Sequence, residues 1–173
     1  MSIGLDFLAE LKVESQVSRR YLASVPFEKK DFKPSPKSES LGRLAIHLAE
    51  IMAWWTACVI EDKLDFIDFE PEVINSTEDL LSYYDRLVEQ AFDALRTVKD
   101  EEFSKDWSMT YGDEILFTLS KKQVARTFCM NHLVHHRAQL SVYFRLLDIP
   151  VPAVYGPSAD DEQVLTIQAL NNY

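Results

Sequence analysis

The stretch SLGRLAIHLAEIMAWWTACVI, residues 40–60, predicts a helix that is apolar on nearly every side. One stripe of large apolar side chains follows the three- and four-residue spacing of a helical face. The positions between the members of that stripe are apolar as well, at Ile46, Met52, Trp54 and Cys58. A helix that is hydrophobic all round is buried in a protein core. We therefore expect residues 40–60 to form the central helix of a helical bundle.

Three further segments carry a helical pattern. In residues 4–24, apolar side chains recur four positions apart. Residues 75–98 give the clearest signal, because Ser76 is a favourable N-cap and acidic residues follow it at the positive end of the helix dipole. The pattern returns over residues 120–147 and ends before Pro150, which cannot continue a helix.

The connections between these helices differ in length. Residues 25–39 contain two prolines that flank a serine, and they predict a loop. Residues 100–118 lose the helical period, and we expect a long connection there with one short extended piece at 115–118. The tail, residues 154–173, predicts a turn and one short C-terminal helix. Four long helices without a convincing series of strands predict an all-α fold, a four-helix bundle that forms one domain over residues 1–173.

The charge balance narrows the range of partners. The chain has 18 basic and 28 acidic residues, which gives a net charge of −10. A nucleic-acid-binding protein usually needs a basic face, and anionic membranes repel an acidic protein, so neither partner is expected. The start of the chain has no signal-peptide pattern, and no run of about 18 apolar residues occurs. We expect a soluble cytoplasmic protein in which Cys58 and Cys129 are buried, reduced thiols.

Three of the four histidines lie within NHLVHHRAQL, residues 131–140. On a helix, positions four apart differ by about 40° around the axis, so His132 and His136 face the same way. His132 and His135 are about 60° apart and form an alternative pair. We favour His132 with His136, because that face continues through Cys129, Leu140 and Tyr143.

A metal site is the sharpest hypothesis for these histidines. Neutral imidazole binds zinc, nickel, copper and iron, and three protein ligands leave an open position for water or substrate. His47, on the central helix, can supply a third nitrogen across the bundle core. The competing hypothesis is structural: a core histidine is usually satisfied by one hydrogen bond, and an i, i+4 pair can lie on the surface.

Several known kinds of metal site are excluded by the neighbouring residues. A zinc-protease motif needs a glutamate directly after the first histidine, where this chain has Leu133. No histidine follows a glutamate by three positions, so the di-iron bundle pattern is absent. The cysteines form no C-x-x-C motif, which excludes a zinc knuckle.

Other polar and aromatic residues also have predicted roles. Glu50 can orient His47, although an ion pair or a solvated position is the more common role. Arg137 can capture an anionic substrate or pair with a carboxylate of the bundle. Gln139 is expected to hydrogen-bond a neighbouring helix. The tryptophans are expected to fill the core, at Trp54, Trp55 and Trp107.

Two stretches together resemble the DinB-like (DinB/YfiT-type) family of bacterial metalloenzymes. They are LGRLAIHLAEIMAWW, residues 41–55, and HLVHHRAQLSVYFRLLDIPVPAVYGPSADD, residues 132–161. The resemblance spans about residues 5–155. It implies a four-helix bundle with a long crossover connection and a divalent metal, usually nickel or zinc. His47, His132 and His136 match the metal ligands of the family. Ala138 stands where the family commonly has glycine.

The resemblance also implies a range of functions. Some relatives are thiol-dependent S-transferases that use mycothiol, bacillithiol or similar small thiols, and members often form homodimers. We therefore expect a metal-dependent transferase with a small-molecule substrate and a role in stress response. No side chain stands out as a general base, which favours thiol transfer over hydrolysis. The alternatives are a metal-dependent hydrolase and a non-catalytic bundle that binds a ligand or a partner.

Overall fold

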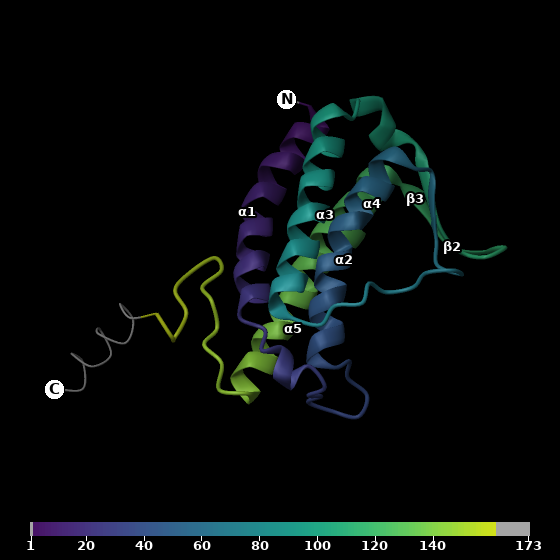
Figure 1. Ribbon diagram of the computed structural model, residues 1–173. Helices are drawn as coiled ribbons and strands as arrows, with labels where there is room; N and C mark the ends of the chain where they lie inside the picture. Colours follow the sequence, from purple (N-terminus) through teal and green to yellow (C-terminus); the bar gives the residue numbers. More distant parts are fainter. Residues whose placement is uncertain (1, 162–173) are drawn as a thin grey trace.

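Four helical rods run side by side in the computed structural model, which describes residues 2–161 (Figure 1). The first three are α1 (Ile3–Ala23), α2 (Leu41–Ile60) and α3 (Thr77–Thr97). The fourth combines α4 (Lys121–Val124), a π-helical segment (Ala125–Asn131) and α5 (His132–Leu146). The predicted N-cap Ser76 accepts a hydrogen bond from the backbone N–H of Asp79. The bundle that the sequence predicted is therefore present, and its helix ends lie within about two residues of the expected ones.

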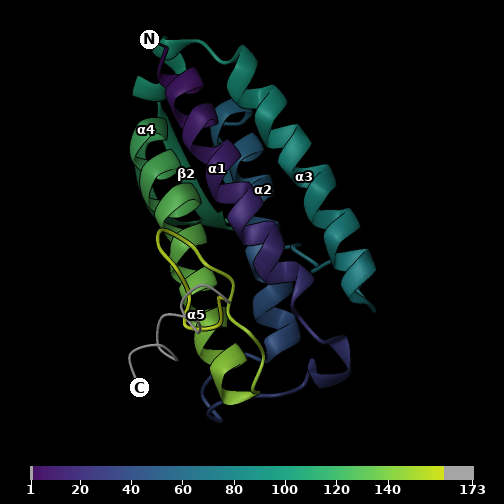
Figure 2. The same cartoon turned by 90° about the vertical axis from the view of Figure 1, so that its left-hand side faces the viewer.

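The connection between α2 and α3 is the long crossover. Residues 61–76 leave the upper end of α2 and return to the lower end of α3, so the two helices run in the same direction (Figure 1). The helices α1 and α5 run the opposite way, which the turned view also shows (Figure 2). This arrangement places the middle of α2 directly beside the start of α5.

A small sheet beside the bundle corrects the all-α expectation. It consists of β1 (Lys63–Asp65), β2 (Asp106–Tyr111) and β3 (Glu114–Ser120), with β1 parallel to β2 and β2 antiparallel to β3. The sequence predicted one short extended piece at 115–118 and a connection over the rest of 100–118. The strands were missed because β3 exposes apolar side chains such as Ile115, and because a bulge beside Met109 breaks the alternation in β2.

The core is built around α2, as its all-round hydrophobicity predicted. Leu48, Ala49, Ile51 and Trp55 have no exposed surface. Among residues 2–161, α2 is the one helix that is long and apolar enough to cross a membrane, judged by length and composition alone. Of its most apolar 18-residue stretch, 56% is buried within the bundle. Its apolar surface is therefore accounted for by packing against the other helices.

The fourth rod differs from the continuous helix expected over residues 120–147. Ser120 and Gln123 form a capping box that starts α4, and the wider π-helical turns follow at once. Cys129 lies in these turns and is fully buried, as is Cys58, and both are free thiols as predicted. The short C-terminal helix expected at the end of the chain lies outside the described residues.

Candidate metal centre

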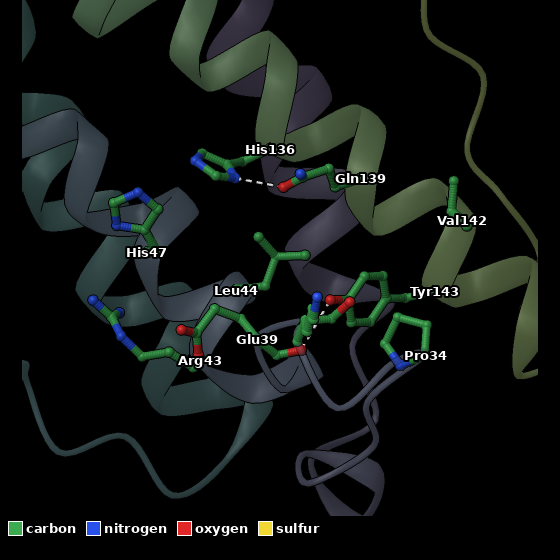
Figure 3. Close-up of a pocket in the computed structure, with 11 residues that line it drawn as sticks. Pro34, Glu39, Arg43, Leu44, His47, His136, Gln139, Val142 and Tyr143 are labelled. Atoms are coloured by element: carbon green, nitrogen blue, oxygen red, sulfur yellow. Dashed lines mark hydrogen bonds between the residues drawn. The ribbon is translucent and has the colours of Figure 1, made fainter.

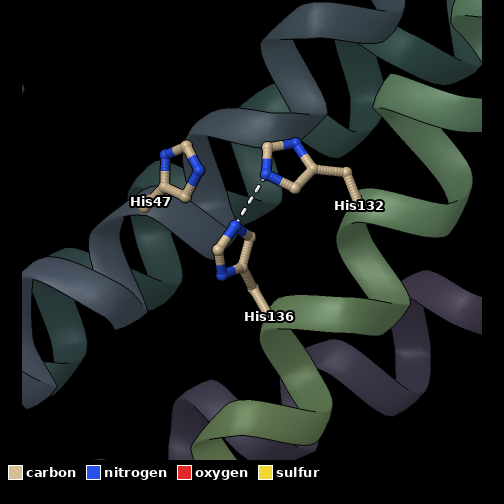
Figure 4. A group of neighbouring side chains, drawn as sticks. All are labelled: His47, His132 and His136. Atoms are coloured by element: carbon tan, nitrogen blue, oxygen red, sulfur yellow. Dashed lines mark hydrogen bonds between the residues drawn. The ribbon is translucent and has the colours of Figure 1, made fainter. Parts of the chain in front are cut away.

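Three histidines from two helices meet at the point where α2 passes the start of α5 (Figure 4). His47 comes from the middle of α2, and His132 and His136 occupy successive turns of α5. One ring nitrogen from each histidine lies within 4.8 Å of the other two. The Nε2 atoms of His132 and His136 are 2.6 Å apart. The tertiary structure thus assembles the three residues that the sequence analysis selected, and we refer to them as the histidine cluster.

His135 lies outside the histidine cluster. Its side chain is exposed, and it contributes no nitrogen to the group of three. Its ring packs edge-on against that of His136, with 4.9 Å between the centroids. The pairing of His132 with His136 is therefore the one that the helix presents toward α2, as the 40° offset of positions four apart requires.

Glu50 holds the ring of His47 from the next turn of α2. The Oε2 atom of Glu50 lies 3.4 Å from Nδ1 of His47 and 2.8 Å from the Arg43 guanidinium. Burial by itself raises the pKa of the Glu50 carboxyl, but the contacts with His47 and Arg43 outweigh burial and leave its pKa below the ordinary value. The charged carboxylate accepts a hydrogen bond from Nδ1–H of His47, which leaves the lone pair on Nε2 free to bind a metal ion. Glu50 is thus both ion-paired and in contact with His47.

Gln139 holds the ring of His136 in a similar way (Figure 3). Its Oε1 atom lies 2.7 Å from Nδ1 of His136. Since an amide oxygen only accepts hydrogen bonds, Nδ1 of His136 carries the proton and the lone pair on Nε2 faces the cluster. The expectation that Gln139 would bond to a neighbouring helix is wrong, because its partner lies one turn away on its own helix.

The two histidines of α5 are neutral at pH 7. Burial and then the neighbouring imidazoles lower the pKa of His132 to about 4. Burial also lowers the pKa of His136 to about 4, even though Gln139 favours the charged form. Because Nδ1 of His136 carries its proton, Nε2 of His136 accepts a hydrogen bond from Nε2 of His132 at 2.6 Å when no cation is bound. Three imidazoles with converging ring nitrogens fit a divalent metal ion of borderline softness.

Trp54 forms one wall of the histidine cluster. Its ring centroid lies 5.0 Å from that of His132 and 5.9 Å from that of His47, and the side chain is half-buried. Trp55 and Trp107 fill the core as expected. Trp54 departs from that expectation because successive helical positions diverge by about 100°, which turns it toward the site while Trp55 faces the core.

Arg137 belongs to a different part of the bundle, although it follows His136 directly. Its buried guanidinium lies 2.6 Å from the Glu14 carboxylate and donates to the Ser18 hydroxyl at 3.2 Å and to the Tyr155 hydroxyl at 2.9 Å. Of its two predicted roles, pairing with a carboxylate of the bundle is the one that the structure shows.

A cavity of about 640 Å³ opens in front of the histidine cluster (Figure 3). His47 and His136 line it together with Arg43, and the loop before α2 contributes Lys37 and Glu39. The proline and lysine content of that loop predicted a connection and gave no sign that it would line a cavity. The histidine cluster therefore faces a polar space large enough for a small molecule, within the range of about 300–1,000 Å³ typical of ligand sites.

A four-helix bundle whose facing helices present three imidazoles to a cavity is a familiar architecture for a metal-binding protein. A family model for the DinB family matches residues 1–169, and the chain belongs to this family. A comparison with curated proteins found no match.

Solved structures of DinB-like proteins share the fold. One from Bacillus cereus ATCC 10987 superposes with a TM-score of 0.64 at 21% sequence identity, covering 86% of this chain and 95% of that one. Another, YjoA from Bacillus subtilis, has a TM-score of 0.67 at 15% identity and covers 86% of this chain and 96% of that one. At these identities the likeness establishes the architecture.

Proposed function

We propose that His47, His132 and His136 bind a divalent metal ion, nickel or zinc, and that the protein is a thiol S-transferase acting on small molecules. The single observation that carries the proposal is the convergence of three imidazole nitrogens within 4.8 Å of one another at the wall of a cavity. Glu50 and Gln139 support it, because each holds a ligand ring by Nδ1 and turns Nε2 toward the cluster.

The proposed reaction joins a low-molecular-weight thiol to an electrophilic carbon. A bound divalent ion lowers the pKa of a thiol or a water, which supplies a nucleophile at neutral pH. The thiol proton passes to solvent, the sulfur forms a bond to the carbon, and the leaving group departs with its bonding electrons. In this scheme the two α5 histidines and His47 position the nucleophile, and the cavity admits the thiol.

Thiol transfer fits the site better than hydrolysis does. Glu50, the carboxylate that touches the cluster, is already engaged by Arg43 and His47. A thiol loses its proton more readily than water and needs less help from a base. Hydrolysis is the second candidate, because Glu39 lines the same cavity and could accept a proton from water. Without either reaction, the bundle would be a non-catalytic module that binds a ligand or a partner.

The remaining features of the proposal rest on the resemblance and on the charge. We propose a cytoplasmic homodimer with a role in stress response and without nucleic-acid or membrane partners. The net charge of −10 supports the last point. Light scattering on the purified protein checks the dimer, which a monomeric mass at micromolar concentration would contradict.

The first test is elemental analysis of the purified protein. We expect about one nickel or zinc per chain in the wild type and in His135→Ala, and almost none in His47→Ala or His136→Ala. Absence of divalent metal from the wild type, together with unchanged melting of His47→Ala, would show that the metal proposal is wrong.

The second test asks which reaction the loaded protein performs. Mass spectrometry is used to follow N-acetylcysteine with 1-chloro-2,4-dinitrobenzene, and conjugate above the His136→Ala background supports thiol transfer. A panel of small esters and amides tests hydrolysis, and Glu39→Gln would then reduce the rate. Metal-loaded protein without turnover in either assay would favour the non-catalytic alternative.

A further inference from the structure

A second cavity lies on the other side of the histidine cluster. It has a volume of about 350 Å³ and is lined by Trp54, Met109, Phe128, Thr127 and His132, with Asn131 and His135 completing the wall. His47 and His136 line the first cavity, whereas His132 lines the second. The histidine cluster therefore contributes side chains to both cavities.

The chemistry of the two cavities differs. Lys37, Glu39 and Arg43 make the first one polar and charged. In the second, none of the lining residues has a carboxylate, an ammonium or a guanidinium group, and the large contributors are an indole, a phenyl ring and a thioether. Burying an unpaired charge among such groups costs free energy. A flat apolar ring, in contrast, can pack against the rings of Trp54 and Phe128.

The walls of the second cavity are held in place from behind. Phe128 stacks on Phe117 of β3 with 4.4 Å between ring centroids and 17° between their planes. Trp54 packs edge-on against Phe66 at 5.8 Å. Met109 is buried on β2 and offers a soft, polarizable surface suited to aromatic ligands. The sheet thus supports a preformed pocket, which lowers the entropic cost of binding.

The π-helical segment shapes the rim of this cavity. Thr127, Phe128 and Asn131 all lie within residues 125–131. A π-helical turn is wider than an α-helical one and is less favourable locally, so it persists where packing or function maintains it. Here it brings Phe128 and Thr127 into the wall directly before the helix that carries His132 and His136.

We propose that this apolar cavity is the acceptor site, which binds a flat aromatic electrophile with an apolar ring while the polar cavity takes the hydrophilic thiol. The inference rests on the proposed transferase function and adds the class of the second substrate. The thiol sulfur forms a bond to a ring carbon that carries a halide, the carbon–halogen bond breaks, and the halide leaves with its bonding electrons. The thiol proton passes to solvent, so no further reactant is needed.

Binding of an unreactive acceptor analogue tests the cavity without turnover. The probe is 1,3-dinitrobenzene, which has the ring of the acceptor but no leaving group. We expect saturable binding to the wild type by calorimetry, and nuclear Overhauser contacts from the probe to the Met109 methyl group and the Trp54 indole. Contacts confined to other parts of the protein, or no saturable binding, would overturn the proposal.

A pair of tryptophan variants locates the binding. Thr127→Trp places an indole in the cavity from an exposed position, and the resulting steric conflict should raise the probe dissociation constant at least about tenfold. Gln90→Trp, on the exposed face of α3, is the matched control and should bind the probe as the wild type does. Equal affinities of the two variants for the probe would overturn the proposal. If Thr127→Trp does not fold, the nuclear Overhauser contacts between the probe and the wild-type protein decide whether the cavity is the binding site.

His136→Ala separates this inference from the proposed function. The residue does not line the apolar cavity, so the variant should still bind 1,3-dinitrobenzene while it loses metal and thiol conjugation. If the wild type conjugates thiols and Thr127→Trp does so equally well at low acceptor concentration, the acceptor site lies elsewhere and the transferase proposal stands. If no metal or conjugation is found but Thr127→Trp alone loses the probe, the cavity is an aromatic ligand site and the transferase proposal fails.

Discussion

Two adjacent residues of α5, His136 and Arg137, belong to two polar regions of opposite character. On one face, the histidine cluster brings three imidazole rings together, and burial lowers the pKa of His132 and of His136 so that these two are uncharged at pH 7. On the other face, the Arg137 guanidinium is met by the Glu14 carboxylate and by two hydroxyl groups. Since both regions are at least partly buried, burial does not distinguish them. The difference is that oppositely charged partners complete the Arg137 region within the bundle, whereas the histidine cluster presents converging ring nitrogens that suit an added cation.

The largest expected effect is the loss of metal from the histidine cluster. His136→Ala should abolish stoichiometric binding of nickel or zinc, because only two of the three imidazole ligands then remain. Calorimetric titration of the metal-free protein measures this. His135→Ala, one position earlier and exposed, is the matched control. Equal metal affinity of His136→Ala and His135→Ala would contradict the assignment of His136 as a metal ligand.

Breaking the Arg137 region should affect stability and leave metal binding unchanged. Arg137→Met leaves the Glu14 carboxylate without its partner, and removal of one member of a buried ion pair costs about 3–5 kcal/mol. Urea denaturation measures the change in the free energy of unfolding. The double variant Arg137→Met with Glu14→Met should recover much of the loss, because an apolar replacement of both partners is often nearly neutral. A drop in metal stoichiometry for the folded single variant would mean that the two regions are coupled.

Loss of the residues that hold the ligand rings should have an intermediate effect. Gln139→Leu removes the partner of Nδ1 of His136, and loss of such a supporting contact typically lowers metal affinity about 10–100-fold. Competition with a chelator of known affinity gives the dissociation constant. Ser141→Ala, also on α5 and bonded only to a backbone carbonyl, serves as the comparison and should change affinity little.

Acid should lower the stability of the metal-free protein through the histidine cluster. The folded-state pKa of His132 and of His136 is about 4, below the value of about 6.5 expected in the unfolded chain. Below pH 6.5 the unfolded chain therefore binds protons that the folded protein does not, and the free energy of unfolding falls as pH drops from 6.5 to 4. Urea denaturation of metal-free protein at pH 7 and pH 5 measures the decrease, which should be smaller in His136→Gln. An equal decrease in that variant would contradict the assignment.

Much of the bundle could be predicted from local patterns. Periodicity and capping depend on residues that are close together in the chain, so the sequence shows them directly. Examples are the apolar stripe over residues 75–98, the N-cap Ser76 and the all-round apolarity of α2. The sheet could not be predicted in the same way. β3 exposes Ile115 and Leu116, so its burial does not alternate as a half-buried strand should. Its pairing with β2, and that of β2 with β1, depends on contacts between segments that lie far apart in the chain.

The sequence by itself predicted the four helices and favoured His132 with His136 over His132 with His135, because a helical rise and a 100° rotation relate nearby residues without any help from the rest of the fold. Only the tertiary structure decided that His47 reaches them and that Trp54 and the sheet line an apolar cavity beside the cluster. Those contacts join segments up to about 85 residues apart in the chain. Their geometry is set by how α2 packs against α5, which no local pattern encodes.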